Sequence, residues 1–212
     1  MFADFVKMTS QEEFAMEHTR HAIFNVRQVV EMSLFAGISF LLMFISFPIL
    51  PFVSYMRIDF SDIPILIGTV LFGPIGGIII AAIKGLLYWL MTGVDLANFI
   101  GVFASFVASV SIVLPFSLVM KKTTGRSLLS RLALSGIALT LSLTIVMALL
   151  NWLVLTPVYM AVLGMKISMP LAQMVLFGVV PFNFIKGVLI SLVIGFVVSR
   201  MHTFLKKEST IL

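Results

Sequence analysis

Long apolar runs alternate with short polar segments along the whole chain. The first run ends at Pro48, and the second begins after the helix-capping candidates Ser61 and Asp62 and ends at a turn marked by Gly73-Pro74. A run of about 20 apolar residues can cross a bilayer as a helix. Six runs can be distinguished, at about 29–47, 63–72, 75–91, 96–120, 132–155 and 171–198. The pattern predicts an all-α integral membrane protein, a bundle of six transmembrane helices.

The composition is typical of a membrane protein rather than a soluble one. Hydrophobic residues make up 60% of the 212 residues, charged residues only 11%, and the mean hydropathy is +1.17. So little charge could not cover a soluble globule of this size. We therefore expect a cytoplasmic N-terminal segment at 1–27, one six-helix membrane domain at 28–200 and a cytoplasmic tail at 201–212.

Basic residues mark the two sides of the membrane. The terminal segments and the loops after the second and fourth runs hold ten lysines and arginines, whereas the other loops hold only Arg57 and Lys166. Because cytoplasmic loops carry the excess of Lys and Arg, both termini are predicted to be cytoplasmic. The net charge of +5 then reflects topology, and we expect no nucleic-acid partner.

Two lysines remain inside the apolar runs and need a physical explanation. A charge at mid-bilayer costs on the order of 3 kcal/mol, so such a residue faces the bundle interior, pairs with a partner or lines a site. For Lys84 we expect structural pairing, whereas Lys186 is the candidate for a binding site. Asp59, Asp62 and Asp95 are expected to cap helices or contact water rather than bind a ligand.

Asparagines accompany Lys186 at the same predicted depth. Asn183 precedes it by three residues and shares its helix face, and the rise per residue places Asn151 and Asn98 at a similar level in the outer half. Amides and one ammonium could hold a planar heterocycle with a polar tail against aromatic side chains. The aromatic candidates are Trp89, Trp152 and Tyr159. Alternatively, the amides only join helices and Lys186 snorkels to the interface.

A pair of small residues, Ser33 and Gly37, lies in the first apolar run. Two small residues four positions apart let another helix approach closely. The strip could dock a partner subunit or serve packing within the bundle, and the pattern alone leaves both open.

Several kinds of chemistry are missing from the sequence. It has no Walker motif and no cysteine, and every histidine lies in a segment expected to be cytoplasmic. No carboxylate is expected deep in a span, where ion-coupled carriers commonly have one. We therefore expect neither an enzyme nor a self-sufficient carrier, and no cofactor or metal, but a binder of a small solute whose partners supply the energy.

Four short segments of the chain match a known family. They are Arg57-Ile-Asp-Phe-Ser-Asp-Ile-Pro-Ile-Leu-Ile-Gly68, Phe72-Gly-Pro-Ile-Gly-Gly-Ile78, Asp95-Leu-Ala-Asn-Phe99 and Val180-Pro-Phe-Asn-Phe-Ile-Lys-Gly187. With these, the chain from about residue 28 to 200 resembles the substrate-binding (S) subunits of energy-coupling factor (ECF) vitamin transporters, and the riboflavin-specific members most closely. The family's docking strip is typically Ala-xxx-Ala, whereas this chain has Ser33 and Gly37.

The resemblance implies a six-helix subunit of a bacterial cell membrane that captures riboflavin near its extracellular face. On the matching positions, Asn151, Asn183 and Lys186 would contact the vitamin, and the depth argument adds Asn98. It also implies a transmembrane coupling subunit and two ATP-binding subunits as partners, and toppling within the membrane lipid to release the cargo. An S subunit or facilitator for another vitamin or small solute, and a structural scaffold, remain as alternatives.

Overall fold

The computed structural model describes residues 24–49, 56–164 and 169–211. The chain divides into two compact units, one up to Glu31 and one from Met32 onward. Most of the expected N-terminal segment, together with Lys166, lies outside the described residues. The elements are α2 (Val26–Phe44), β1 (Phe47–Pro48), β2 (Arg57–Ile58), α3 (Asp62–Thr92), α4 (Leu96–Lys122), α5 (Leu128–Leu150), η2 (Asn151–Leu155), α6 (Thr156–Leu163), α7 (Leu171–Met174), η3 (Val175–Val179) and α8 (Val180–Glu208).

Five helical segments in the described part of the chain are long and apolar enough to cross a membrane. They are Val26–Phe44, Asp62–Thr92, Leu96–Lys122, Leu128–Val162 and Leu171–Thr203. The prediction of an all-α membrane protein is therefore confirmed at the level of five long apolar helices. The second and third runs of the sequence pattern both lie within α3.

α3 is interrupted by a turn at Gly73. This glycine has φ 79° and ψ −179°, outside the helical region, and Pro74 follows it. The side chain of Lys84 donates to the Ser61 hydroxyl at 3.1 Å, although a straight helix would separate residues 23 positions apart by about 34 Å. The chain therefore folds back at Gly73, as the Gly-Pro pair predicted, and the two parts of α3 pack against each other.

The loop after α2 contains a short antiparallel β pair that the all-α prediction did not include. Phe47 lies opposite Ile58, and Pro48 lies opposite Arg57. Proline is tolerated there because a two-stranded pair consists of edge strands only. This pair brings Arg57 and the residues that follow it close to the end of α2.

The helices after α4 are longer than their apolar runs. Pro157 was expected in a connection, but it lies inside a continuous helical segment, because η2 runs directly into α6 at Thr156. Gly164 ends α6 with φ 63°. At the other end, α8 continues beyond the expected boundary at Arg200 to Glu208. The sequence pattern located these helices but misplaced their ends.

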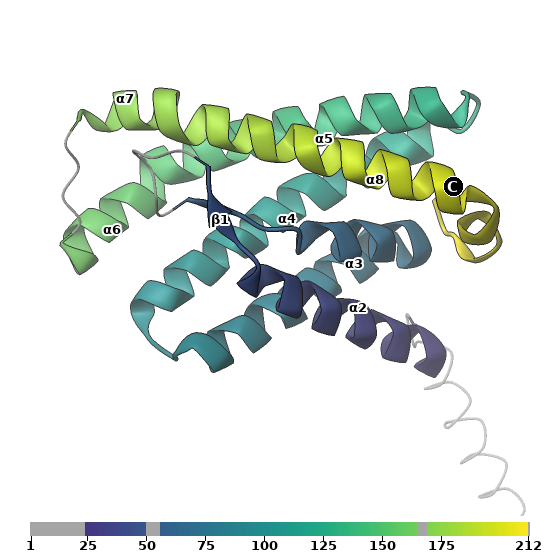
Figure 1. Ribbon diagram of the computed structural model, residues 1–212, viewed down its shortest axis with the longest axis horizontal. Helices are drawn as coiled ribbons and strands as arrows, with labels where there is room; N and C mark the ends of the chain where they lie inside the picture. The colour runs from purple at the N-terminus through teal and green to yellow at the C-terminus, as the bar shows by residue number, and fades with distance from the viewer. Residues whose placement is uncertain (1–23, 50–55, 165–168, 212) are drawn as a thin grey trace, which may run out of the picture. The chain divides into compact units, whose positions relative to one another are not determined.

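Helix packing within the second unit positions the candidate site. α5 packs against both α4 and α8, and α3 packs against α4, as Figure 1 shows for the long α5 and α8 pair. A Cβ atom at Gly187 would lie only 2.8 Å from the Cα of Thr140, so α5 and α8 approach closely where the glycine leaves room. The residues just before Gly187 on α8 are thus held at a fixed distance from α5.

The C-terminal segment packs on the turn in α3. The Thr210 amide donates to the Val70 carbonyl at 3.2 Å, and the Thr210 hydroxyl donates to the Leu71 carbonyl at 2.6 Å. In a continuous helix the Val70 carbonyl would accept from residue 74, which is a proline without an N–H. Arg131 of α5 holds the same segment by donating to the Ile211 carbonyl at 3.0 Å.

Candidate functional site

A cavity of about 350 Å³ brings all four predicted binding residues together. Asn98 comes from α4, Asn151 from η2, and Asn183 and Lys186 from α8, and each of them lines this cavity. The volume lies near the lower end of the range of roughly 300–1,000 Å³ that is usual for small-molecule pockets. Depth counting along the sequence therefore selected residues that share one cavity.

Two of the asparagines are oriented by their own helices. The amide nitrogen of Asn151 donates to the Met147 carbonyl, and that of Asn183 donates to the Val179 carbonyl, each at 2.8 Å. The two side chains make no other hydrogen bond among the described residues. Their amide oxygens therefore remain free to accept a hydrogen bond from a ligand in the cavity. Asn151 begins η2, and Asn183 bonds the last residue of η3. Such π-helical turns occur frequently at functional sites.

Asn98 has a different environment from the other asparagines. Its side-chain nitrogen donates to Asp95 at 2.6 Å and to the Thr92 carbonyl at 3.2 Å. Asp95 in turn accepts from the Asn98 amide and caps α4, which confirms the expectation that this aspartate is a helix cap. The side chain of Asn98 therefore supports the turn before α4 while it also lines the cavity.

The lysine of the cavity belongs to a buried ionic cluster. Lys186 lies 2.9 Å from one oxygen of Asp62 and 3.9 Å from Asp59. The other oxygen of Asp62 lies 3.7 Å from Lys84 and accepts from the Ser109 hydroxyl at 2.6 Å. The expectation that Asp62 is a cap or a solvated loop residue was wrong. It is 1% exposed because the fold of α3 places it between the two lysines.

Lys84 is satisfied entirely by neighbours of this cluster. It is fully buried and donates to the hydroxyls of Ser61, Ser105 and Ser109 at 3.1–3.3 Å. With its 3.7 Å contact to Asp62, the expected structural pairing is confirmed. The cluster contains two lysines and two aspartates and is formally neutral, which limits the cost of placing four ionisable groups in an apolar protein.

The aromatic lining differs from the expectation. Tyr159 lines the cavity together with Tyr88, whereas neither tryptophan does. Trp152 is 51% exposed, and Trp89 packs on Phe99 and donates to the Asp95 carbonyl. Trp152 follows Asn151 directly, so it points away from the face that carries the asparagine.

Sequence reasoning did not assign Arg57, Asp59 or Asp62 to the site. Arg57 lines the cavity and donates to the Ser46 carbonyl at 2.8 Å, which ties β2 to the end of α2. All three belong to the first of the four matching segments. The signal in the sequence was the high density of charged residues beside an apolar run, a pattern that is also typical of helix caps.

The small-residue strip faces outward in the second unit. Ser33 is exposed and Gly37 is half-buried, whereas Met32 and Ala36 are buried on a neighbouring face of α2. A Cβ atom placed on Gly37 would meet no atom within 4 Å. The geometry favours an external contact over packing within this unit.

Comparison with known proteins identifies the family of the chain. Residues 27–198 match the family described as ECF transporter, substrate-specific component. The riboflavin transporter RibU of Staphylococcus aureus (strain TCH60) is 36% identical over 184 residues, covering 85% of this chain and 93% of that protein. The riboflavin transporter FmnP of Bacillus subtilis (strain 168) is 31% identical over 186 residues, covering 87% and 96%.

A solved structure shares the fold as well. A chain from the work described as "Structure and mechanism of the S component of a bacterial ECF transporter" superposes with a TM-score of 0.70 at 36% identity, covering 85% of this chain and 98% of that chain. The family match spans most of the sequence, and the relatives match over nearly their full length. This chain therefore belongs to the substrate-specific components of ECF transporters, which are multi-pass membrane transport subunits and not enzymes.

Proposed function

We propose that this chain captures riboflavin in the cavity lined by Asn98, Asn151, Asn183 and Lys186. The observation that carries the proposal is the convergence of these four residues, from three separate elements, on one cavity. Amide oxygens and nitrogens match the donors and acceptors of a flavin ring, and Lys186 offers an ammonium to its carbonyl or hydroxyl groups. The relatives RibU and FmnP are named as riboflavin transporters, which supports the same ligand.

The proposed topology has six membrane segments, two of which are the two parts of α3. The basic residues Lys121, Arg126 and Arg200 lie at the ends of α4, α5 and α8 that are far along the chain from the cavity residues. Since basic residues favour the cytoplasmic side, the cavity faces outward and both termini are cytoplasmic. The segments 1–27, 28–200 and 201–212 keep their proposed roles as N-terminal segment, membrane domain and tail.

The proposed partners are a transmembrane coupling subunit and two ATP-binding subunits. The family match supports this assignment, because the sequence has no nucleotide-binding motif of its own. The outward-facing strip at Ser33 and Gly37 is the proposed docking surface for the coupling subunit. Small residues there would let a helix of the coupling subunit approach α2 closely and exclude lipid from between them, so that the two subunits move as one.

Flavin fluorescence titration of the detergent-purified chain tests the ligand. Saturable quenching near one riboflavin per chain, with no competition from thiamine, biotin or folate, is the expected result. Saturation by one of the competitors instead would show an S component for another vitamin. A chain that binds none of the four would contradict the proposed function.

Substitutions in the cavity test whether Lys186 and Asn183 bind riboflavin. Lys186→Ala and Asn183→Ala should each weaken riboflavin binding about tenfold or more, because a buried polar contact is lost. Leu118→Ala is the matched control, since Leu118 is exposed on α4 and does not line the cavity. Equal affinities of all three variants would remove Lys186 and Asn183 from the site.

A further inference from the structure

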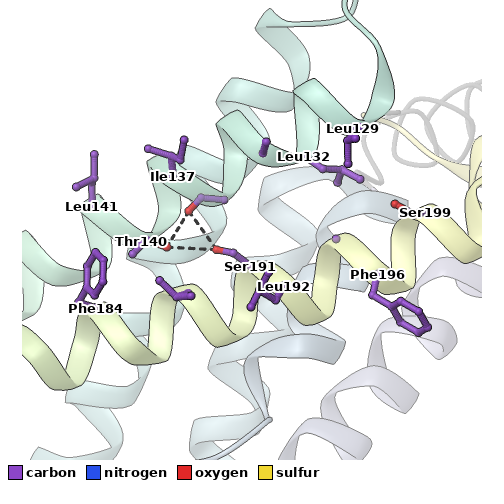
Figure 2. A pocket seen from close by; sticks show the side chains of 14 residues that line it. Leu129, Leu132, Ile137, Thr140, Leu141, Phe184, Ser191, Leu192, Phe196 and Ser199 are labelled. Atoms are coloured by element: carbon purple, nitrogen blue, oxygen red, sulfur yellow. Dashed lines mark hydrogen bonds between the residues drawn. The ribbon is translucent and has the colours of Figure 1, made fainter.

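A groove of about 580 Å³ separates the exposed flanks of α5 and α8, away from the proposed vitamin cavity. Figure 2 shows Leu141 and Phe184 at one end of the groove and Leu129 and Ser199 at the other. Small side chains form its floor, and large apolar side chains form its walls. The groove and the cavity share no lining residue.

The groove results from the close contact between the two helices. A Cβ atom at Gly136 would lie 3.0 Å from the Cβ of Ser191, so the helices meet at the floor. Gly195, one turn further along α8, has no atom within 4 Å of its Cβ position and leaves open space above it. Leu192 and Phe196, which flank Gly195 along α8, are more than 60% exposed and form the wall of the groove on the α8 side.

The floor offers no unsatisfied polar group to a ligand. The Thr140 hydroxyl donates to the Gly136 carbonyl at 2.8 Å, and the Ser191 hydroxyl donates to the Gly187 carbonyl at 2.7 Å. Figure 2 draws the Thr140 bond together with the contacts of the Ser191 hydroxyl with the Thr140 hydroxyl and the Gly136 carbonyl. All these bonds satisfy the hydroxyls within the protein. The surface that remains is apolar and suits a hydrocarbon chain rather than a polar solute.

The groove is longer than the hydrocarbon part of one bilayer leaflet. Its lining on α8 extends from Phe184 to Ser199, a rise of about 22 Å at 1.5 Å per residue. Half of the hydrocarbon core of a bilayer is about 15 Å thick. An extended acyl chain that begins at the interface therefore fits along the groove without leaving its own leaflet.

One end of the groove carries positive charge. The guanidinium of Arg200 lies 5.5 Å from the centre of the Phe196 ring, which is one of the wall residues. Stacking on the ring places the cation at the end of the groove and leaves its planar donors available for a phosphate. Arg126 is exposed one turn before Leu129 at the same end, and none of the described residues that line the groove is acidic.

We propose that this groove binds one acyl chain of an anionic phospholipid whose phosphate contacts Arg200, with Arg126 adding to the positive field. Charge complementarity at one end and apolar complementarity along the rest select this occupant. The lipid is bound from the leaflet that contains the basic ends of α5 and α8. The assignment does not depend on the identity of the vitamin.

Native mass spectrometry of the full chain tests this proposal. The protein is incubated in detergent with equal amounts of phosphatidylglycerol and phosphatidylcholine that carry identical acyl chains, and the retained lipid is counted. The wild-type chain should retain phosphatidylglycerol preferentially. Arg200→Gln should lower this preference about fivefold while phosphatidylcholine is still retained, because only the phosphate contact is lost. Lys207→Gln, the same charge change two turns further along α8, should leave the preference unchanged.

Filling the groove gives an independent test of the acyl chain. Gly195→Phe should lower the retention of both lipids about threefold or more, and Ala133→Phe on the opposite wall should do the same if the first variant folds poorly. Leu118→Phe, at an exposed position on α4, is the matched control. Unchanged retention in Gly195→Phe and Ala133→Phe would overturn the proposal. A dimer of the wild-type chain that these variants disrupt would also overturn it, because the groove would then be an interface between copies.

Discussion

Asp62 joins two buried lysines that are otherwise unrelated in the chain. One of its oxygens contacts Lys186 and the other contacts Lys84 and Ser109. The carboxylate therefore holds the cavity lysine in place and also compensates a lysine that has no access to the cavity. A residue that compensates two charges at once affects both stability and the geometry of the site when it is removed.

Asp62→Asn should lower the free energy of unfolding by about 3 kcal/mol or more and weaken riboflavin binding. The amide keeps the shape of the side chain but leaves two buried lysines without this negative partner. Thermal unfolding in detergent and flavin titration measure the two effects. Asp95→Asn, which changes an exposed cap, should cost about 1 kcal/mol or less and leave binding intact.

Charge balance in the cluster can be tested by a second substitution. Lys84→Met added to Asp62→Asn removes one uncompensated ammonium while it keeps most of the length of the side chain. The double variant should be more stable than Asp62→Asn alone, and a melting temperature equal to or below that of the single variant would contradict this account. Riboflavin binding should recover less, because Lys186 still lacks its 2.9 Å partner.

At the scale of elements, the turn in α3 determines which residues meet. The first part of α3, Asp62 to Phe72, rises only about 16 Å, and Gly73 then reverses the chain so that Ser61 and Asp62 face Lys84. The φ and ψ values of Gly73 lie in a region that is open essentially to glycine alone. Without this residue the ionic cluster could not form.

Gly73→Ala should therefore destabilise the protein by about 1–3 kcal/mol. The reason is backbone strain rather than a clash, because a Cβ atom at this position would meet only the Thr210 hydroxyl at 3.8 Å. Gly125→Ala is the control, since Gly125 has open space around it and no positive φ. Similar melting temperatures for the two variants would show that the turn adapts to a side chain.

The sequence predicted the presence of the helices better than it predicted their ends. The apolar runs located every long helix, because hydrophobic length reports directly on crossing a bilayer. The ends were misplaced at Pro157, which was taken for the start of a connection, and at Arg200, where the helix continues into polar residues. The short β pair was missed because two-residue strands leave no periodic pattern.

At the scale of the whole molecule, ligand binding and partner docking should be separable. Gly37→Trp places a large ring on the outward face of α2, where a Cβ atom meets none of the described residues within 4 Å. Riboflavin binding to the purified variant should be unchanged, while uptake with the partner subunits should fall by tenfold or more. Leu118→Trp adds the same ring on α4 and should leave uptake unaffected. Normal uptake by Gly37→Trp would exclude docking at this strip.

The cavity could be anticipated from sequence only in part. Asn151, Asn183 and Lys186 stood out because polar groups in apolar runs are costly and their depths agreed. Asp62 did not stand out, because its position beside a run end is equally compatible with a cap. Its role depends on a contact with Lys186, a residue more than half of the chain length away in sequence. Local sequence patterns do not predict such long-range contacts.

The C-terminal segment also has a consequence for how the protein is made. The hydroxyls of Ser209 and Thr210 bond the Val70 and Leu71 carbonyls, which are 139 positions earlier in the chain. At the usual speed of translation, 139 residues take roughly seven to thirty seconds to synthesise, and the carbonyls lack their partners during this time. Because unpaired carbonyls are not tolerated in hydrocarbon, the nascent Gly73 turn must stay in contact with interfacial water until Ser209 and Thr210 have been made.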